Sequence, residues 1–166
     1  MIILGIDPGL AIVGFGVVEY KASHFKTLGY GALTTPAHTP IEDRLCMIRK
    51  GMLELIERYR PDEMAIEELF FNTNITTGIQ VAQARGVLLL TAREAGLNIA
   101  EYTPLQVKQS VVGYGRADKK QVISMVQMIL NLNHVPKLDD TADALAIAIC
   151  HGHTGGSGLR NYYNLK

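Results

Sequence analysis

The sequence opens with Met1-Ile2-Ile3-Leu4-Gly5-Ile6-Asp7-Pro8-Gly9, an apolar run that ends in one carboxylate. An uninterrupted Ile and Leu run predicts a strand buried on both faces, in the middle of a sheet that helices cover. Pro8 and Gly9 then end the strand and turn the chain. A charge at Asp7 is tolerated where the strand leaves the core and a metal ion or hydrogen-bond donor meets it. Ordinary turn chemistry explains this stretch too, so the rest of the chain must decide.

Length and composition indicate one globular domain. The chain has 166 residues, 48% of them hydrophobic and 19% charged, which is enough for one domain with a core and too few for two. We expect a single domain over residues 1–153 and a flexible tail over 154–166. Because no apolar run could cross a membrane and no signal peptide is seen, we expect a cytoplasmic protein without a membrane partner. Cys46 and Cys150 lie in apolar helical patterns, so we expect two buried thiols.

The formal net charge of zero hides an uneven distribution. Between residues 72 and 138, seven Lys and Arg stand against three acids. If four acids elsewhere gather around metal ions, the remaining surface is basic. A neutral total therefore does not exclude a nucleic-acid partner.

Patterns after the first strand predict the elements that surround it. Residues 13–20 and 26–34 are rich in β-branched and aromatic side chains, which indicates two antiparallel strands. Residues 41–59 repeat apolar side chains at steps of three and four, as an amphipathic helix does, and Thr39-Pro40-Ile41-Glu42 resembles its capping box. A long helix is expected over about 75–95, ended by Gly96, with Gly86 marking a close approach to the sheet or to another subunit. A strand over 98–102 and two further helices, 104–112 and one that Asp118 caps, follow.

Two later segments also bring carboxylates to the end of an apolar element. Met64-Ala65-Ile66-Glu67-Glu68 predicts a second buried strand, and the carboxyl ends of parallel strands meet at one edge of a sheet. In the Ala-rich helix over 139–150, Asp140 and Asp143 lie about 60° apart on the face that packs on the sheet. Ordinary capping explains Asp139 or Asp140, but it explains Asp143 poorly. His151 and His153 do not share a helix face, so we do not expect them to bind a metal.

Carboxylates without a matching cysteine or histidine suit Mg²⁺ or Mn²⁺ rather than zinc. Four of them would repel one another strongly without cations. With two ions roughly 4 Å apart, they would stabilise the attacking water and the leaving oxygen in phosphodiester cleavage. The pattern therefore predicts a nuclease site.

Basic and aromatic residues offer contacts for DNA. Lys119 and Lys120 fall in the first turn of the helix that Asp118 caps, where cations oppose the helix dipole unless an anion is held there. Two solvated lysines explain this turn equally well. Phe70 and Phe71 follow the second acidic strand, and an exposed one could stack on an unpaired base.

Five motifs, in this order and spacing, resemble those of the RuvC family of Holliday junction resolvases. They are Gly5-Ile6-Asp7-Pro8-Gly9, Ala65-Ile66-Glu67, Gln83-Ala84-Arg85-Gly86, Gln106-Val107-Lys108-Gln109 with Val112-Gly113, and Asp140-Thr141-Ala142-Asp143 with the Ala-rich run after it. The resemblance implies a ribonuclease H-like α/β fold with a mixed five-stranded sheet flanked by helices, a homodimer, and Mg²⁺-dependent paired nicks across a four-way DNA junction. It also implies work in recombination and repair beside a branch-migration motor.

The resemblance also implies residue roles. The catalytic and metal-binding set is Asp7, Glu67, Asp140 and Asp143, with two Mg²⁺ ions per site that Mn²⁺ could replace. Its DNA-binding set is Phe70, Lys108 and Lys119, and we add Lys120 and Arg116 from the same basic stretch. The doubled acids Glu67-Glu68 and Asp139-Asp140 leave the register open, and we choose Asp140 because Asp-x-x-Asp directly precedes the Ala-rich run.

Three alternatives make different demands on the chain. An ATP-binding phosphotransferase of the actin and sugar-kinase type needs two such domains and gives the Asp-x-x-Asp helix no role. A related nuclease that trims ribosomal RNA precursors would not predict the Gln106-Val107-Lys108-Gln109 helix. A catalytically inactive junction-binding module would not need all four carboxylates.

Overall fold

The computed structural model describes residues 1–68, 75–133 and 139–155. Its centre is a five-stranded sheet in the order β3-β2-β1-β4-β5. The strands are β1 (Ile2–Asp7), β2 (Ile12–Lys21), β3 (His24–Thr34), β4 (Glu63–Glu67) and β5 (Asn98–Tyr102). The helices in the described ranges are α1 (Ile41–Tyr59), α2 (Ile75–Glu94), α3 (Pro104–Val112), α4 (Lys119–Ile129) and α5 (Asp139–Gly155).

The sheet is mixed, as predicted, with β1 at its centre. β1, β2 and β3 form an antiparallel meander, whereas β4 runs parallel to β1 and β5 runs parallel to β4. Ile3, Leu4 and Ile6 of β1 are almost completely buried, because helices cover both faces of the strand. The apolar opening run is therefore the core of the sheet.

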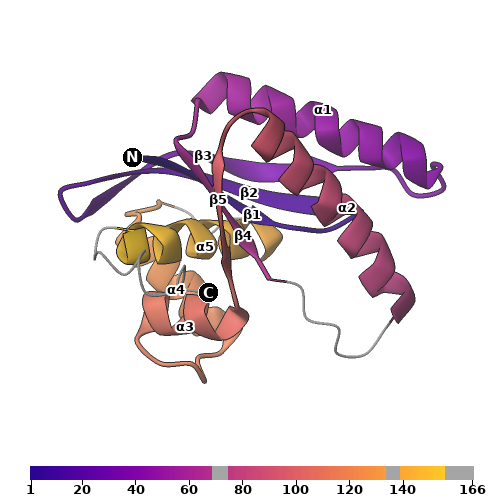
Figure 1. The fold of residues 1–166 in the computed structure, drawn as a ribbon. Helices are drawn as coiled ribbons and strands as arrows, with labels where there is room; N and C mark the ends of the chain where they lie inside the picture. The colour runs from indigo at the N-terminus through magenta and orange to yellow at the C-terminus, as the bar shows by residue number, and fades with distance from the viewer. Residues whose placement is uncertain (69–74, 134–138, 156–166) are drawn as a thin grey trace, which may run out of the picture.

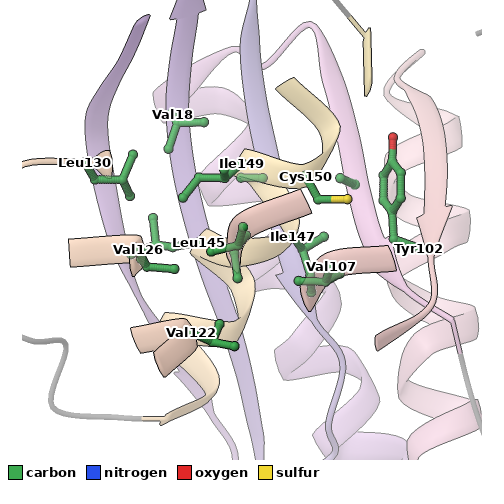
Figure 2. Packing of buried hydrophobic residues seen from close by; sticks show 14 of the residues in the cluster. Val18, Tyr102, Val107, Val122, Val126, Leu130, Leu145, Ile147, Ile149 and Cys150 are labelled. Carbon is green, nitrogen blue, oxygen red and sulfur yellow. The ribbon is translucent and has the colours of Figure 1, made fainter. Parts of the chain in front are cut away.

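Helices cover the sheet on both faces (Figure 1). α1 and α2 lie over one face, and Ile48, Met52 and Leu88 bury their side chains there. α5 lies on the other face, with α3 and α4 packed outside it. Figure 2 shows this second core, in which Val107 of α3 and Val122 of α4 meet α5 side chains such as Ile147. α5 is thus enclosed between the sheet and two helices.

Two glycines let α5 lie close to the strands. A Cβ atom at Gly14 of β2 would stand 2.1 Å from the carbonyl oxygen of Asp140. A Cβ atom at Gly5 of β1 would stand 2.2 Å from the carbonyl oxygen of Ala144. Any larger residue would push the helix away, so these two positions fix where the first turns of α5 sit.

The helix ends confirm most of the predicted signals and correct one. Asp118 caps α4 in a capping box with Gln121, and Gly96, with φ of +83°, follows α2. The capping box at Thr39 is wrong, because α1 begins at Ile41 with Pro40 at the N-cap and no side-chain cap. Thr39 therefore lies one residue too early for its hydroxyl to reach the free N–H groups.

Three further residues or segments differ from expectation. Cys150 is buried, and burial raises its pKa to about 11, but Cys46 is exposed on α1, so the prediction of two buried thiols is wrong for it. Gly86 has no atom within 4 Å of the position of an added Cβ, which excludes a close approach to the sheet. α5 continues through Thr154 and Gly155, beyond the expected domain boundary.

Among the described residues, none of the helices combines the length and apolar character that a membrane crossing needs.

Candidate active site at the carboxyl edge of β1 and β4

Three elements bring carboxylates to one edge of the sheet. Asp7 is the last residue of β1 and Glu67 is the last residue of β4. The two strands are parallel with Ile6 opposite Ile66, so both carboxylates leave the sheet at the same edge. Gly14, which pairs with Asp7 across β1 and β2, holds the start of α5 close to this edge. The local sequence of each element thus explains why the acids converge.

The carboxyl group of Asp7 has a strongly raised pKa. Its pKa is raised to about 8, mainly by burial and then by the charges of Glu67, Asp143 and Asp140 in that order, while Lys119 opposes the rise. Asp7 is therefore protonated at neutral pH in the protein without metal. Its carboxyl group is hydrogen-bonded to Glu67, so the two acids share one proton.

Glu67 and Asp143 are also shifted by burial. Burial and the charge of Asp143 raise the pKa of Glu67, and burial raises the pKa of Asp143 against the opposing effect of Lys119. The Lys119 ammonium lies 3.1 Å from Asp143 and 3.4 Å from Asp139. A proton and an ammonium group thus offset part of the negative charge of the site.

The doubled acids behave differently within each pair. Asp140 is among the charges that raise the pKa of Asp7, whereas Asp139, with 69% of its side chain exposed, is not. Glu67 bonds to Asp7, whereas Glu68 is exposed and follows β4. The electrostatic contributions, with the exposure of Asp139 and Glu68, therefore favour Asp140 and Glu67 as the candidate members that face Asp7.

The donor chemistry of the site fits a hard divalent cation. Asp7, Glu67, Asp140 and Asp143 offer only carboxylate oxygens, and their mutual repulsion raises the pKa of Asp7, which a bound cation would reverse. Within residues 1–68, 75–133 and 139–155, no three acidic, histidine or cysteine side chains are already arranged as a metal-binding group. The fit thus rests on charge and donor type.

Two of the predicted DNA-binding residues, Lys108 and Lys119, lie beside this edge. Lys108 and Lys119 line a cavity of about 200 Å³ together with Glu67 and Asp143, and its floor is apolar, formed by Val107, Val122 and Ile147. Arg116 and Lys120 are exposed just before and within the first turn of α4. Phe70 lies outside the described residues. The prediction of an external anion at Lys119 is wrong for the protein alone, because the Lys119 ammonium already contacts the carboxylates of Asp139 and Asp143.

Arg85 supports Glu67 in a way that the sequence analysis missed. Its Nε donates to the main-chain carbonyl of Glu67 at 3.3 Å, and its guanidinium also binds the carboxylate of Glu101 on β5. Only 14% of the Arg85 side chain is exposed, so α2 holds the end of β4 through a largely buried cation. Its place in the Gln-Ala-Arg-Gly motif was the available signal.

A second polar group that the sequence analysis missed lies at the opposite end of β4. His151 of α5 contacts the carboxylate of Glu63 at 2.5 Å through Nε2 and the hydroxyl of Tyr102 at 2.8 Å through Nδ1. All three residues are at most 8% exposed. These residues come from elements far apart in the sequence, so no local spacing of residues could have predicted their contact.

Comparison with known proteins gives a consistent family. The family model described as crossover junction endodeoxyribonuclease RuvC matches residues 3–151. A protein of that name from Clostridioides difficile is 60% identical over 154 residues, which cover 93% of this chain and 91% of the relative. The matched span includes all four candidate carboxylates.

Solved structures agree with the sequence comparison. Thermus thermophilus RuvC in complex with a Holliday junction superposes with a TM-score of 0.90 at 38% identity, covering 95% of this chain and 96% of that one. The yeast mitochondrial Holliday junction resolvase Ydc2 shares the fold at 14% identity, with a TM-score of 0.68 over 98% of this chain and 83% of that one. The ribonuclease H-like architecture expected from the sequence is confirmed.

Proposed function

Because the chain belongs to the RuvC family of crossover junction endodeoxyribonucleases, we propose that it resolves four-way DNA junctions by symmetric paired nicks, in recombination and repair. One observation carries the proposal for the site, namely that Asp7, Glu67 and Asp143 interact electrostatically at one edge of the sheet. The Thermus relative, which is similar over nearly its full length, has been solved with a Holliday junction.

Asp7, Glu67, Asp140 and Asp143 would hold two Mg²⁺ ions, for which Mn²⁺ would substitute. When bound, such ions lower the pKa of the attacking water and stabilise the charge that builds on the phosphate. The carboxylates must first ionise, so Asp7 gives up the proton that it shares with Glu67. Cleavage leaves a 5′-phosphate on the product.

Lys119 has to change partner during this cycle. Its ammonium contacts Asp143 and Asp139 in the protein alone, and divalent cations at the carboxylates would remove the need for it there. The freed ammonium lies on the wall of the cavity that Lys108 also lines. Both lysines would then bind backbone phosphates, and Lys120 and Arg116 would extend the contact along the DNA. Phe70 is proposed to contact a base near the junction.

A homodimer places two sites on a junction of twofold symmetry. The exposed face of α2 supports this assembly, because Ile79 and Leu90 are 53% and 59% exposed and Gly86 lies between them with open space above it. These residues recur at helical spacing on one side of α2. Leu90→Lys is expected to shift the protein to monomer in sedimentation experiments, whereas Met128→Lys, at a 70% exposed site on α4, is not. A branch-migration motor is the proposed second partner, and the cytoplasm is the proposed location.

The activity is tested on a synthetic mobile four-way junction in Mg²⁺. Wild type is expected to cut the junction with paired nicks and to leave linear duplex intact. Asp143→Asn is expected to lose cleavage while it still binds the junction in EDTA, because the carboxamide removes a charge without removing the lysines around it. Met128→Lys serves as a control for surface substitution.

Other outcomes would identify the alternative functions. Binding without cleavage by wild type would favour an inactive junction-binding module. Cleavage of an RNA–DNA hybrid or of structured RNA in place of the junction would favour the RNA-trimming relatives. Either result would overturn the proposed resolvase activity.

A further inference from the structure

We propose that Glu63, His151 and Tyr102 form a positioning clamp, which fixes the register of α5 against β4 and thereby aligns Asp140 and Asp143 with Glu67. The three residues come from three elements, β4, α5 and β5. None of them lines the cavity that Glu67 and Asp143 share with the two lysines. The inference rests on the proposed junction cleavage, whose carboxylates the clamp would align.

The placement of the clamp follows from the direction of α5. Gly5 meets Ala144 and Ala148, whereas Gly14, beside Asp7, meets Asp140, so α5 runs opposite to β1 and β4. Glu63 precedes Glu67 by four residues, about 13 Å along a strand. His151 follows Asp143 by eight residues, about 12 Å along a helix. The two elements are thus joined at one end by the clamp and carry the carboxylates at the other.

Each side chain of the clamp has a hydrogen-bond partner when the histidine is neutral, and the Tyr102 hydroxyl also bonds to Thr154. Burial lowers the pKa of His151 to about 4, so its Nε2–H donates to the Glu63 carboxylate at 2.5 Å. Its Nδ1 then accepts from the Tyr102 hydroxyl at 2.8 Å, and burial raises the pKa of that hydroxyl to about 12. A buried polar network in which every member is bonded is rigid and specific, because any shift leaves a buried group unsatisfied.

β5 extends the effect of the clamp to the end of β4. Tyr102 is the last residue of β5, it pairs with Glu67 in the sheet, and its carbonyl accepts from the main-chain N–H of Glu68 at 2.9 Å. One side chain of the clamp therefore belongs to the residue that holds the main chain beside Glu67. A movement of the Tyr102 ring would therefore shift the main chain of Tyr102, which pairs directly with the candidate metal ligand Glu67.

His153 offers a matched control two residues away on α5. It contacts Ser110 of α3 at 3.1 Å, so it also ties α5 to a neighbour, but not to β4. It is exposed. The clamp itself borders a cavity of about 690 Å³, which leaves room for a substituted side chain and water at residue 151.

The experiment compares His151→Gln and Tyr102→Phe with His153→Gln in the full chain. Mn²⁺ binding is measured by calorimetry without DNA, cleavage is measured in single turnovers across Mg²⁺ concentrations, and junction binding is measured in EDTA. We expect both clamp variants to weaken Mn²⁺ binding and to raise the half-saturating Mg²⁺ concentration by about threefold to tenfold. Junction affinity in EDTA should stay within about twofold of wild type for all three variants, and His153→Gln should leave metal binding unchanged.

A purely structural role would give a different result. The clamp variants would then lose thermal stability while the folded protein kept wild-type metal affinity, and that outcome would overturn the inference. If His151→Gln fails to fold, Tyr102→Phe, which removes one hydroxyl, decides the question. If wild type does not cut the junction, the proposed function fails, and the metal-binding comparison still judges the clamp.

Discussion

The two ends of the α5 and β4 pair bury polar groups in opposite ways. At one end Asp7, Glu67 and Asp143 crowd their charges together, and burial with this crowding raises the pKa of Asp7 to about 8. At the other end Glu63, His151 and Tyr102 satisfy one another through bonds of 2.5 and 2.8 Å. The first arrangement is costly without a cation, and the second is stable without any ligand. The α5 and β4 pair, with Asp7 of β1 and Tyr102 of β5, thus has a candidate reactive end and a rigid end.

The largest expected effect comes from removing one carboxylate at each end. Asp7→Asn should lower junction cleavage by about a thousandfold or more, because it removes a proposed metal ligand. It should raise the stability of the metal-free protein, because an amide does not have to take up the proton that the buried Asp7 carboxyl group binds on folding. Glu63→Gln should do the reverse, lowering stability by about 1–3 kcal/mol while cleavage at saturating Mg²⁺ stays within about tenfold. Cleavage assays and urea unfolding in EDTA test both. Equal losses of cleavage activity in Asp7→Asn and Glu63→Gln would show that the two ends do not have different roles.

Gly14→Ala should break the reactive end through the backbone. The new Cβ would stand 2.1 Å from the carbonyl oxygen of Asp140, so the start of α5 must move away from Asp7. We expect a loss of about 1–3 kcal/mol in unfolding free energy. We also expect a lower cleavage rate in the protein that remains folded. Gly155→Ala, at the other end of α5, meets only the Met1 side chain at 3.5 Å and should change neither quantity. Normal cleavage by Gly14→Ala would show that the close contact is not needed.

The pH dependence of stability separates the ends next. The pKa of Asp7 rises from 3.8 to about 8 on folding, so the folded state binds more protons than the unfolded state between these values. The unfolding free energy of the metal-free protein should therefore fall as pH rises through that window. Urea unfolding in EDTA at about pH 5.5 and pH 8 should show a larger fall in wild type than in Asp7→Asn. Parallel profiles for the two proteins would speak against a buried shared proton.

Lys119→Met should have the smallest effect on the free energy of unfolding. The Lys119 side chain is 49% exposed, so its ion pair with Asp143 is worth only about 0.5 kcal/mol in the metal-free protein. That cost should disappear in saturating Mg²⁺, if Asp143 binds the metal as proposed. Lys120→Met, at the next position of α4, should leave stability unchanged in both conditions. A Lys119→Met cost that persists in Mg²⁺ would mean that the lysine does not exchange its partner.

Much of the reactive end could be predicted from sequence because short-range rules govern it. Strand direction places Asp7 and Glu67 at one edge, and helical periodicity turns Asp143 toward the sheet. Lys119 on Asp143 could not be predicted, since that contact depends on how α4 packs against α5. The same holds for the clamp, because Glu63 and His151 are 88 residues apart and the helix spacing of His151 and His153 argued only against metal binding.

Local signals also failed where one residue of offset or the exposed side of a helix decided the outcome. Thr39 resembles a cap, but the helix starts after Pro40. Cys46 follows an apolar residue of α1 yet points to solvent, because only part of the helix circumference meets the sheet. Gly86 suggested a close approach to the sheet or to another subunit, and the described chain contradicts only the first of these.

In the metal-free protein, a proton and the Lys119 ammonium group offset the negative charge that divalent cations would offset when bound. Calorimetric titration of the protein with Mn²⁺ at pH 7, repeated in buffers of different ionisation enthalpy, counts the protons released on binding. Because Asp7 has a pKa of about 8, it carries a proton at pH 7 that metal binding would displace. We predict release of about one proton per site in wild type and clearly less in Asp7→Asn. Binding of Mn²⁺ to wild type without proton release would contradict the account.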